Sequence, residues 1–292
     1  MKKIICLTIL FVFIFVQSLL AFDWKDLHTQ ADSRILKDAQ EIIMVNPDSV
    51  SDLYVLGLIY LNLRMNKEAE SVFTKIVNLD KDLYEAKWGI AEVKRREHQL
   101  DKAEESLVEI KEAYPDFAPA LISLAYIKYI KMDFNAAVKL ASTVVYYGKD
   151  KVDLSNYVRA LLLVGGSKGM IAHYGGPISK LINGMAVFPN LKRAEEFQPD
   201  SSQVLFGLGS FYLLAPSAAG GNIDFAFNYL EKAAKLDPGF SDCFVRLAQA
   251  YKIKGDMKKY EINIAKALEL DPQNEIALDV KSGSCKFICL GK

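Results

Sequence analysis

Residues 53–76 read LYVLGLIYLNLRMNKEAESVFTKI and contain two successive apolar patterns. The first follows the i, i+3, i+4, i+7 spacing of one helical face, at Leu53, Leu56, Gly57 and Tyr60. The second has the spacing of another helix, at Ala69, Phe73 and Ile76. Gly57 and Ala69 are small enough to let two helix backbones approach, while large neighbours fill the adjacent space. The stretch therefore predicts two antiparallel helices that cross at these small residues.

This pattern recurs along the chain at intervals of 34 residues. The small residue of the second helix returns at Ala69, Ala103 and Ala137, and nearer the C-terminus at Ala233 and Ala267. The residue that closes each unit returns at Pro47, Lys81, Pro115 and Lys149, and later at Pro238 and Pro272. Proline suits a boundary because it cannot continue a helix but can begin the next one. A fixed period of this length indicates a repeat architecture.

The period divides the chain into helical pairs. We predict full pairs at about 50–83, 84–117, 118–151, 201–240 and 241–274, after a partial pair that ends near Pro47. The predicted organisation is N-terminal units over 22–151, an irregular helical unit over 152–200, C-terminal units over 201–281 and a loosely held tail over 282–292. Because each pair buries its apolar faces on its neighbours, the predicted fold class is all-α: a solenoid wound into a right-handed superhelix with a concave surface.

The repeat resembles the tetratricopeptide repeat (TPR) family. Its most typical segments are the unit endings Lys-Ala-Ala-Lys-Leu-Asp-Pro at 232–238 and Lys-Ala-Leu-Glu-Leu-Asp-Pro at 266–272. The last unit also has the family's residues at Leu247-Ala248, Tyr251 and Gly255-Asp256. The resemblance covers roughly residues 27–150 and 185–275. It implies a scaffold that binds a protein or peptide partner in its concave groove, but it does not identify that partner.

The residues that would face this groove come from the first helix of each pair. Aligning the units by 34 residues stacks Tyr54 with Trp88, Glu92 with Tyr126, and Arg95 with Tyr129. Tyr, Trp and Arg are over-represented among binding hot spots. We therefore predict a partner-binding set of Tyr54, Trp88, Arg95, Tyr126 and Tyr129. Packing between successive first helices is the alternative role for each of them.

The period is interrupted in the middle of the chain. The step from Lys149 to Pro199 is 50 residues, and ten of the 17 glycines lie between 165 and 221. Insertions in loops cost little stability and often carry function. We expect the insertion at 165–184 to be a lid over the groove, with His173 and Tyr174 as candidate contacts.

A second interruption is the loop Ala-Pro-Ser-Ala-Ala-Gly-Gly-Asn at 215–222. It is similar to the same region of TPR-type T components, periplasmic proteins associated with TRAP transporters. Those proteins are often lipoproteins, whereas this chain has no lipidation box after its apolar segment. The resemblance implies an alternative function, an accessory protein that handles a small ligand for a transporter.

Residues 1–21 have the three parts of a secretory signal peptide. Lys2 and Lys3 precede an apolar run from Ile4 to Val16, and Ala21 is a small residue at the expected cut. We predict an exported protein, periplasmic or secreted, and an uncleaved membrane anchor over 4–21 is the alternative. Three cysteines would remain after cleavage, at Cys243, Cys285 and Cys289, and the sequence leaves their pairing open.

Composition and motifs argue against other classes of function. The 36 basic and 36 acidic residues balance, so no global field attracts nucleic acid. Gly165 to Gly169 lack the spacing of a phosphate-binding loop, and the three histidines have no ligand-spaced partner. No nucleophile or acid pair stands out. We expect no enzyme activity, no cofactor and no metal site, and the sequence leaves homo-oligomerisation open.

Overall fold

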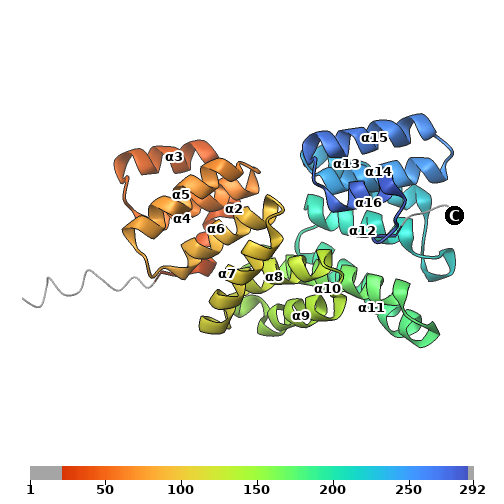
Figure 1. The fold of residues 1–292 in the computed structure, drawn as a ribbon, viewed down its shortest axis with the longest axis horizontal. Coiled ribbons are helices and arrows are strands. Elements are labelled where there is room, and N and C mark those ends of the chain that lie inside the picture. The colour runs from red at the N-terminus through yellow and green to blue at the C-terminus, as the bar shows by residue number, and fades with distance from the viewer. Residues whose placement is uncertain (1–21, 289–292) are drawn as a thin grey trace, which may run out of the picture.

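The computed structural model describes residues 22–288, and these fold into helices joined by short loops, with no strand among them (Figure 1). The helical pairs are α2 (Trp24–Ser33) with α3 (Leu36–Val45), α4 (Val50–Asn62) with α5 (Asn66–Leu79), α6 (Tyr84–Arg96) with α7 (Leu100–Ala113), α8 (Ala118–Ile130) with α9 (Phe134–Lys151), α10 (Leu154–Tyr174) with α11 (Pro177–Phe197), α12 (Ser202–Leu214) with α13 (Ile223–Leu236), and α14 (Ser241–Ile253) with α15 (Met257–Leu270). A final helix, α16 (Glu275–Ser282), follows. The chain is an all-α solenoid, as the repeat predicts.

The signal-like segment 1–21 and Cys289 lie outside the described residues. Of the other two cysteines, Cys285 takes part in a disulfide bond and Cys243 is a buried free thiol. Between residues 22 and 288, no helix is both long and apolar enough to cross a bilayer.

Phe73 shows why small residues recur at the helix crossings. Its side chain is completely buried between α4 and α6. A Cβ atom added to Gly57 would come within 2.7 Å of the Phe73 ring, and one added to Gly89 within 2.5 Å. One aromatic ring therefore fills the space left by two glycines on successive first helices, which confirms the crossing that the sequence predicts.

The irregular unit does not contain the lid that we expected from its glycines. Gly165, Gly166 and Gly169 lie inside α10 and Gly184 lies inside α11, so the insertion lengthens both helices to 21 residues. Only Gly175 and Gly176 form a connection. Gly165 serves close packing instead: a Cβ atom there would lie 3.2 Å from Leu191 Cδ2 on α11. The segment predicted as a lid thus belongs to two long helices joined at Gly175 and Gly176.

The tail is also better held than the sequence suggests. Phe287 is buried, and its backbone N–H and that of Lys286 both donate to the carboxylate of Asp279, at 2.8 Å. The backbone carbonyl of Phe287 accepts from Arg246, and that of Ile288 accepts from Gln249. Residues 283–288 therefore pack onto the inner face of α14 rather than hanging free.

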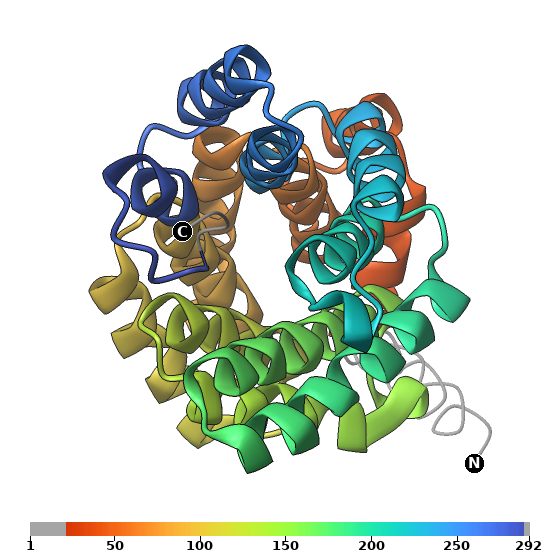
Figure 2. The same cartoon turned by 90° about the vertical axis from the view of Figure 1, so that its right-hand side faces the viewer.

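The solenoid curves so strongly that loops of its N-terminal units contact the ends of its C-terminal units. Figure 1 shows the N-terminal helices, in orange, and the C-terminal helices, in blue, as two groups connected through α8 to α11, and Figure 2 views them from the C-terminal side. Arg64 Nη2 contacts Asp237 Oδ2 at 2.5 Å. His98 contacts Asp271 Oδ1 at 3.0 Å and Glu275 Oε1 at 2.9 Å. These ion pairs join residues that lie about 175 positions apart in the sequence.

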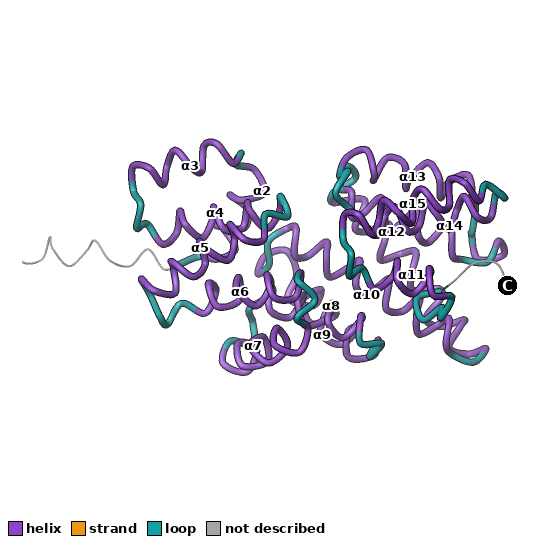
Figure 3. The backbone as a smooth tube through the Cα atoms, turned by 45° about the horizontal axis from the view of Figure 1, so that its top comes forward, coloured by secondary structure: helices purple, strands orange, loops and turns teal. Residues whose placement is uncertain are grey.

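The ion pairs of Arg64 and His98 occupy equivalent positions in the repeat. Arg64 and His98 are 34 residues apart, and so are their partners Asp237 and Asp271. Arg64 and His98 have φ values of 62° and 60°, the left-handed conformation that ends a helix. The loops in which they lie appear in teal in Figure 3. The same loop position in successive units therefore supplies a cation, and the Leu-Asp-Pro endings supply the acids.

We expect the contribution of His98 to closure to depend on pH. Hydrogen bonds to Asp271 and then to Glu275 raise the pKa of His98 to about 10 from 6.5. Because the pKa of His98 is higher in the folded protein than in the unfolded chain, its protonation stabilises the fold fully below pH 6.5. This stabilisation is lost as the pH rises to about 10. The melting temperature of the wild type should therefore exceed that of His98→Gln at pH 6, and the gap should narrow towards pH 10.

Arg64→Gln is the matched control, because a guanidinium stays protonated over this range. Its gap from the wild type should stay constant between pH 6 and pH 10. An equal gap for His98→Gln at both pH values would show that His98 does not act through its charge.

Candidate ligand chamber

On its concave side the solenoid surrounds a large chamber with a volume of about 1830 Å³, which stays partly open to solvent. Its walls come from the first helices α6, α8, α10, α12 and α14, and from α11 and the start of α16. The concave surface predicted from the repeats therefore forms the wall of this chamber. The inter-turn ion pairs of Arg64 and His98 lie at its border, since both residues and their partners also line the chamber.

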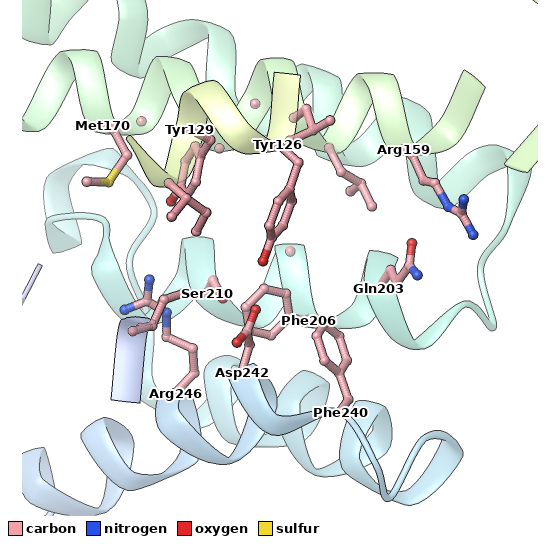
Figure 4. Close-up of a pocket in the computed structure, with 18 of the residues that line it drawn as sticks. Tyr126, Tyr129, Arg159, Met170, Gln203, Phe206, Ser210, Phe240, Asp242 and Arg246 are labelled. Carbon is pink, nitrogen blue, oxygen red and sulfur yellow. The ribbon is translucent and has the colours of Figure 1, made fainter. Parts of the chain in front are cut away.

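Most of the chamber wall is aromatic or aliphatic. Figure 4 shows Tyr126 and Tyr129 projecting from α8 towards the facing helices α12 and α14. Phe206 of α12 and Phe240, just before α14, lie below them with ring centroids 4.8 Å apart and ring planes tilted by 50°. Met170 closes one side. Such a wall suits a ligand with a substantial apolar part.

One buried charge cluster on α6 is partly compensated, because one carboxylate pairs with two guanidinium groups. Glu92 accepts from Arg95 Nη2 at 2.6 Å and from Arg96 Nε at 2.9 Å. Burial alone would raise the pKa of Glu92, but the two guanidinium groups outweigh it and hold the pKa well below its usual range. The hydroxyl of Ser123 donates to Glu92 and accepts from the indole of Trp88. This network fixes the wall and carries a net charge of about +1 from its one carboxylate and two guanidinium groups.

A second polar group, on α14, is not compensated in this way. Arg246 is 4% exposed, and among residues 22–288 no carboxylate lies within ion-pair distance of it. Its Nε is buried without a hydrogen-bond partner, and so is Ser210 Oγ. Asp242, one turn earlier, accepts from Asn274 Nδ2 at 2.5 Å, and burial raises its pKa. The hydroxyl of Tyr126 points towards Asp242 (Figure 4).

The loop at 215–222 forms part of the chamber wall. Ala215, Pro216, Ala218 and Ala219 line the chamber, and the short helix η1 (Ser217–Ala219) shapes the loop. Glycine is required at 221, because a Cβ atom there would lie 1.9 Å from the backbone oxygen of Ala215. Asn222 caps α13 by accepting from the N–H groups of Asp224 and Phe225. The second interruption of the period thus has a structural role at the chamber.

The residues predicted to bind a partner lie in different places in the structure. Tyr126, Tyr129, Trp88 and Arg95 line the chamber. Tyr54 does not, because it is completely buried and its hydroxyl bonds with His28 Nε2 at 3.1 Å. Packing is therefore the role of Tyr54, and its prediction as a contact is wrong.

The two residues predicted from the insertion are also separated. His173 lines the chamber, whereas Tyr174 lies outside it and donates its hydroxyl to the carbonyl of Lys286. Arg95 is committed to Glu92 and lies over the Tyr126 ring, with its Cζ 4.2 Å from the ring centroid. Its predicted role as a donor for a ligand would compete with these contacts.

The wall formed by Phe206, Phe240, Asp242 and Arg246 was not predicted from the sequence. A signal for Arg246 was present, however. Aligned on Leu247-Ala248, Arg246 takes the position of Val55, Gly89 and Ser123 in the N-terminal units. A charged residue where other units have small or apolar ones marks a special environment, since charges are rarely buried unless paired.

Comparison with known proteins agrees with this geometry. The sequence profile of the tetratricopeptide repeat matches residues 53–83 and 241–274. At these two segments the chain carries tetratricopeptide repeats. Repeats of this family generally act as non-catalytic scaffolds for interactions with proteins. No curated protein matches the TPR chain in sequence.

Similar solved structures share the fold at low sequence identity. The Cut9–Hcn1 hetero-tetramer of APC/C matches 87% of the TPR chain with a TM-score of 0.59 and 14% identity. A tetratricopeptide repeat protein from Parabacteroides merdae matches 87% with a TM-score of 0.52 and 14% identity, and 90% of its own length is covered. The IFIT1 monomeric mutant with Gppp-AAAA matches 80% with a TM-score of 0.54 and 16% identity, over 54% of its length. The TPR chain spans 47% of the matched APC/C chain.

Proposed function

We propose that this protein binds a small amphiphilic molecule inside the chamber. The observation that carries the proposal is that the solenoid surrounds a mostly apolar chamber of about 1830 Å³, bordered by the ion pairs of Arg64 and His98. Small-molecule pockets are usually about 300–1,000 Å³, lined by apolar side chains with a few polar groups. This chamber exceeds that range, so it can hold an extended molecule or a short peptide. A folded domain of about 50 residues or more is too large to enter.

The proposal favours the ligand-handling alternative over a peptide in an open groove. Export would place this chamber at the cell envelope, supported by the signal-like residues 1–21. Handling a ligand for a TRAP-type transporter is supported by the 215–222 loop, which lines the chamber. N-terminal sequencing of the mature protein tests the export step, because a start at Met1 would reject cleavage.

Docking of a protein partner is the second candidate function, and one feature of α11 favours it. This helix exposes an apolar stripe in which 62–75% of each side chain is accessible: Ile178, Leu181, Ile182 and Met185. Leu181 and Met185 also line the chamber, so the stripe borders it. Exposed apolar patches commonly mark interaction sites. A partner that receives or delivers the ligand would meet this stripe, and Ile182→Asp should weaken its binding in a pull-down.

Filling the chamber should abolish ligand binding. Gly166 of α10 lines the chamber, and a Cβ atom there would meet only Tyr129, at 3.9 Å. Gly166→Phe can therefore be accommodated while its ring occupies the chamber. We expect the wild type to bind the neutral fluorescent probe N-phenyl-1-naphthylamine with saturation, and Gly166→Phe to lose at least about tenfold in affinity, or about 1.4 kcal/mol.

The control is Gly176→Phe, at an exposed position outside the chamber where an added Cβ atom meets nothing within 4 Å. It should bind the probe like the wild type. Unsaturable probe binding, or equal affinity of the wild type and Gly166→Phe, would contradict the proposed function.

A further inference from the structure

The chamber contains a buried cation with one unused face. Arg246 Nη1 donates to Gln249 Oε1 at 2.8 Å and to the carbonyl of Phe287 at 3.3 Å. These bonds fix the guanidinium plane. Within residues 22–288, Nε and Nη2 on the opposite edge have no hydrogen-bond partner. Burying a charge without a partner costs free energy, so we expect this edge to bind an anion.

Three hydroxyl groups face the same part of the chamber. Ser210 Oγ is buried without a partner. The hydroxyls of Tyr126 and Tyr129 make no hydrogen bond to any residue in 22–288, and both tyrosines line the chamber. Figure 4 shows Tyr126 and Tyr129 on one side and Ser210 and Arg246 on the other, facing each other across the space. A hydroxyl can donate to an anion, so these groups can complete its coordination.

We infer that Arg246 is the anchor of a subsite for a carboxylate head group, whose apolar chain lies along Phe206 and Phe240. The inference rests on the proposed chamber function and names its ligand class, a carboxylate-bearing amphiphile. The Nε–Nη2 edge of a guanidinium matches the two oxygens of a carboxylate in a bidentate pair. A carboxylate also matches the single positive charge of Arg246.

Asp242 is the group that opposes this assignment. Its carboxylate lies one helical turn from Arg246, and it could instead favour a cationic head group. One observation reduces its influence on the bound anion: it accepts a hydrogen bond from Asn274 Nδ2, which turns a donor towards its negative charge. The test must nevertheless include a cationic ligand.

The test is displacement of N-phenyl-1-naphthylamine by four ligands with the same ten-carbon chain: decanoate, decyl phosphate, decanol and decylammonium. On the wild type, decanoate should bind about 10- to 100-fold more tightly than decanol, the range of a hydrogen bond to a charged group. It should also bind more tightly than decyl phosphate. Tighter binding of decyl phosphate or decylammonium would overturn the carboxylate assignment.

Substitutions test which residue produces the preference for decanoate. Arg246→Met should bring decanoate to the affinity of decanol and leave decanol unchanged. Arg193→Met is the matched control, since Arg193 lies outside the chamber over the Tyr157 ring, and it should keep the preference for decanoate. Tyr129→Phe should weaken decanoate alone. This variant removes a hydroxyl with no partner among residues 22–288, so it serves if Arg246→Met does not fold.

The outcomes separate the two proposals. If the probe binds but the four ligands displace it equally, the carboxylate subsite is wrong and the chamber function stands. If the probe does not bind, both proposals fail. An unchanged preference for decanoate in Arg246→Met would place the anion elsewhere.

Discussion

Replacing Phe73 by alanine is expected to lower the free energy of unfolding by about 3 to 5 kcal/mol, the usual cost of a large cavity in a core. The ring is completely buried and contacts the positions of Gly57 and Gly89 on two successive first helices. The surrounding helices cannot easily collapse onto the space, because both neighbours lack side chains that could move into it. Urea unfolding followed by circular dichroism measures the change.

A matched substitution on the same helix separates this effect from helix propensity. Leu79→Ala, at a residue that is 46% exposed, should change stability by much less. Gly57→Leu should also destabilise, by about 1 to 3 kcal/mol, since its first side-chain atom already meets the Phe73 ring. A loss below about 1 kcal/mol for Phe73→Ala would mean that the helix crossing is misplaced.

Glu92→Gln is expected to cost about 3 to 5 kcal/mol, because it leaves two buried arginines without their counter-charge. The substitution keeps the shape of the side chain, so packing is preserved. Only 14% of the Arg95 side chain and 19% of the Arg96 side chain are exposed, so solvent screens their charges little. Thermal or urea unfolding at pH 7 measures the loss, and Glu105→Gln on the exposed face of α7 is the control.

The pH dependence of this loss provides a second check. The folded-state pKa of Glu92 is lowered, so its stabilisation is complete above about pH 4.5 and is lost as the pH falls towards the folded-state pKa. The stability gap between the wild type and Glu92→Gln should therefore narrow on acidification below pH 4.5. A gap that is small at pH 7 would show that solvent already compensates the arginines.

The repeat was predictable from the sequence because it depends on local spacing. Gly57, Ala69 and Phe73 determine how neighbouring helices pack, and these residues lie within one unit. The glycines of the irregular unit were wrongly predicted to form a loop. The sequence alone does not distinguish a glycine that permits close helix packing from one that ends a helix. Leu191, against which Gly165 packs, lies on the following helix.

Closure of the solenoid was not predictable in this way. It depends on the curvature that accumulates over several units and on pairs such as Arg64 with Asp237, 173 residues apart. An alignment by period stacks neighbouring first helices but does not show which of them face each other across the axis. For this reason the 34-residue spacing predicted Tyr126 and Tyr129 but did not predict Arg246 on the opposite wall.

The central claim is that the repeats close into a ligand-binding chamber, and a crystal structure with bromodecanoate tests it most directly. The anomalous signal of bromine locates the apolar end of the ligand independently of its surroundings. We predict a bromine peak inside the chamber, near Phe206 and Phe240, with the carboxylate at Arg246. A peak found only outside the chamber, such as on the exposed stripe of α11, or a solenoid whose ends do not meet, would contradict the claim.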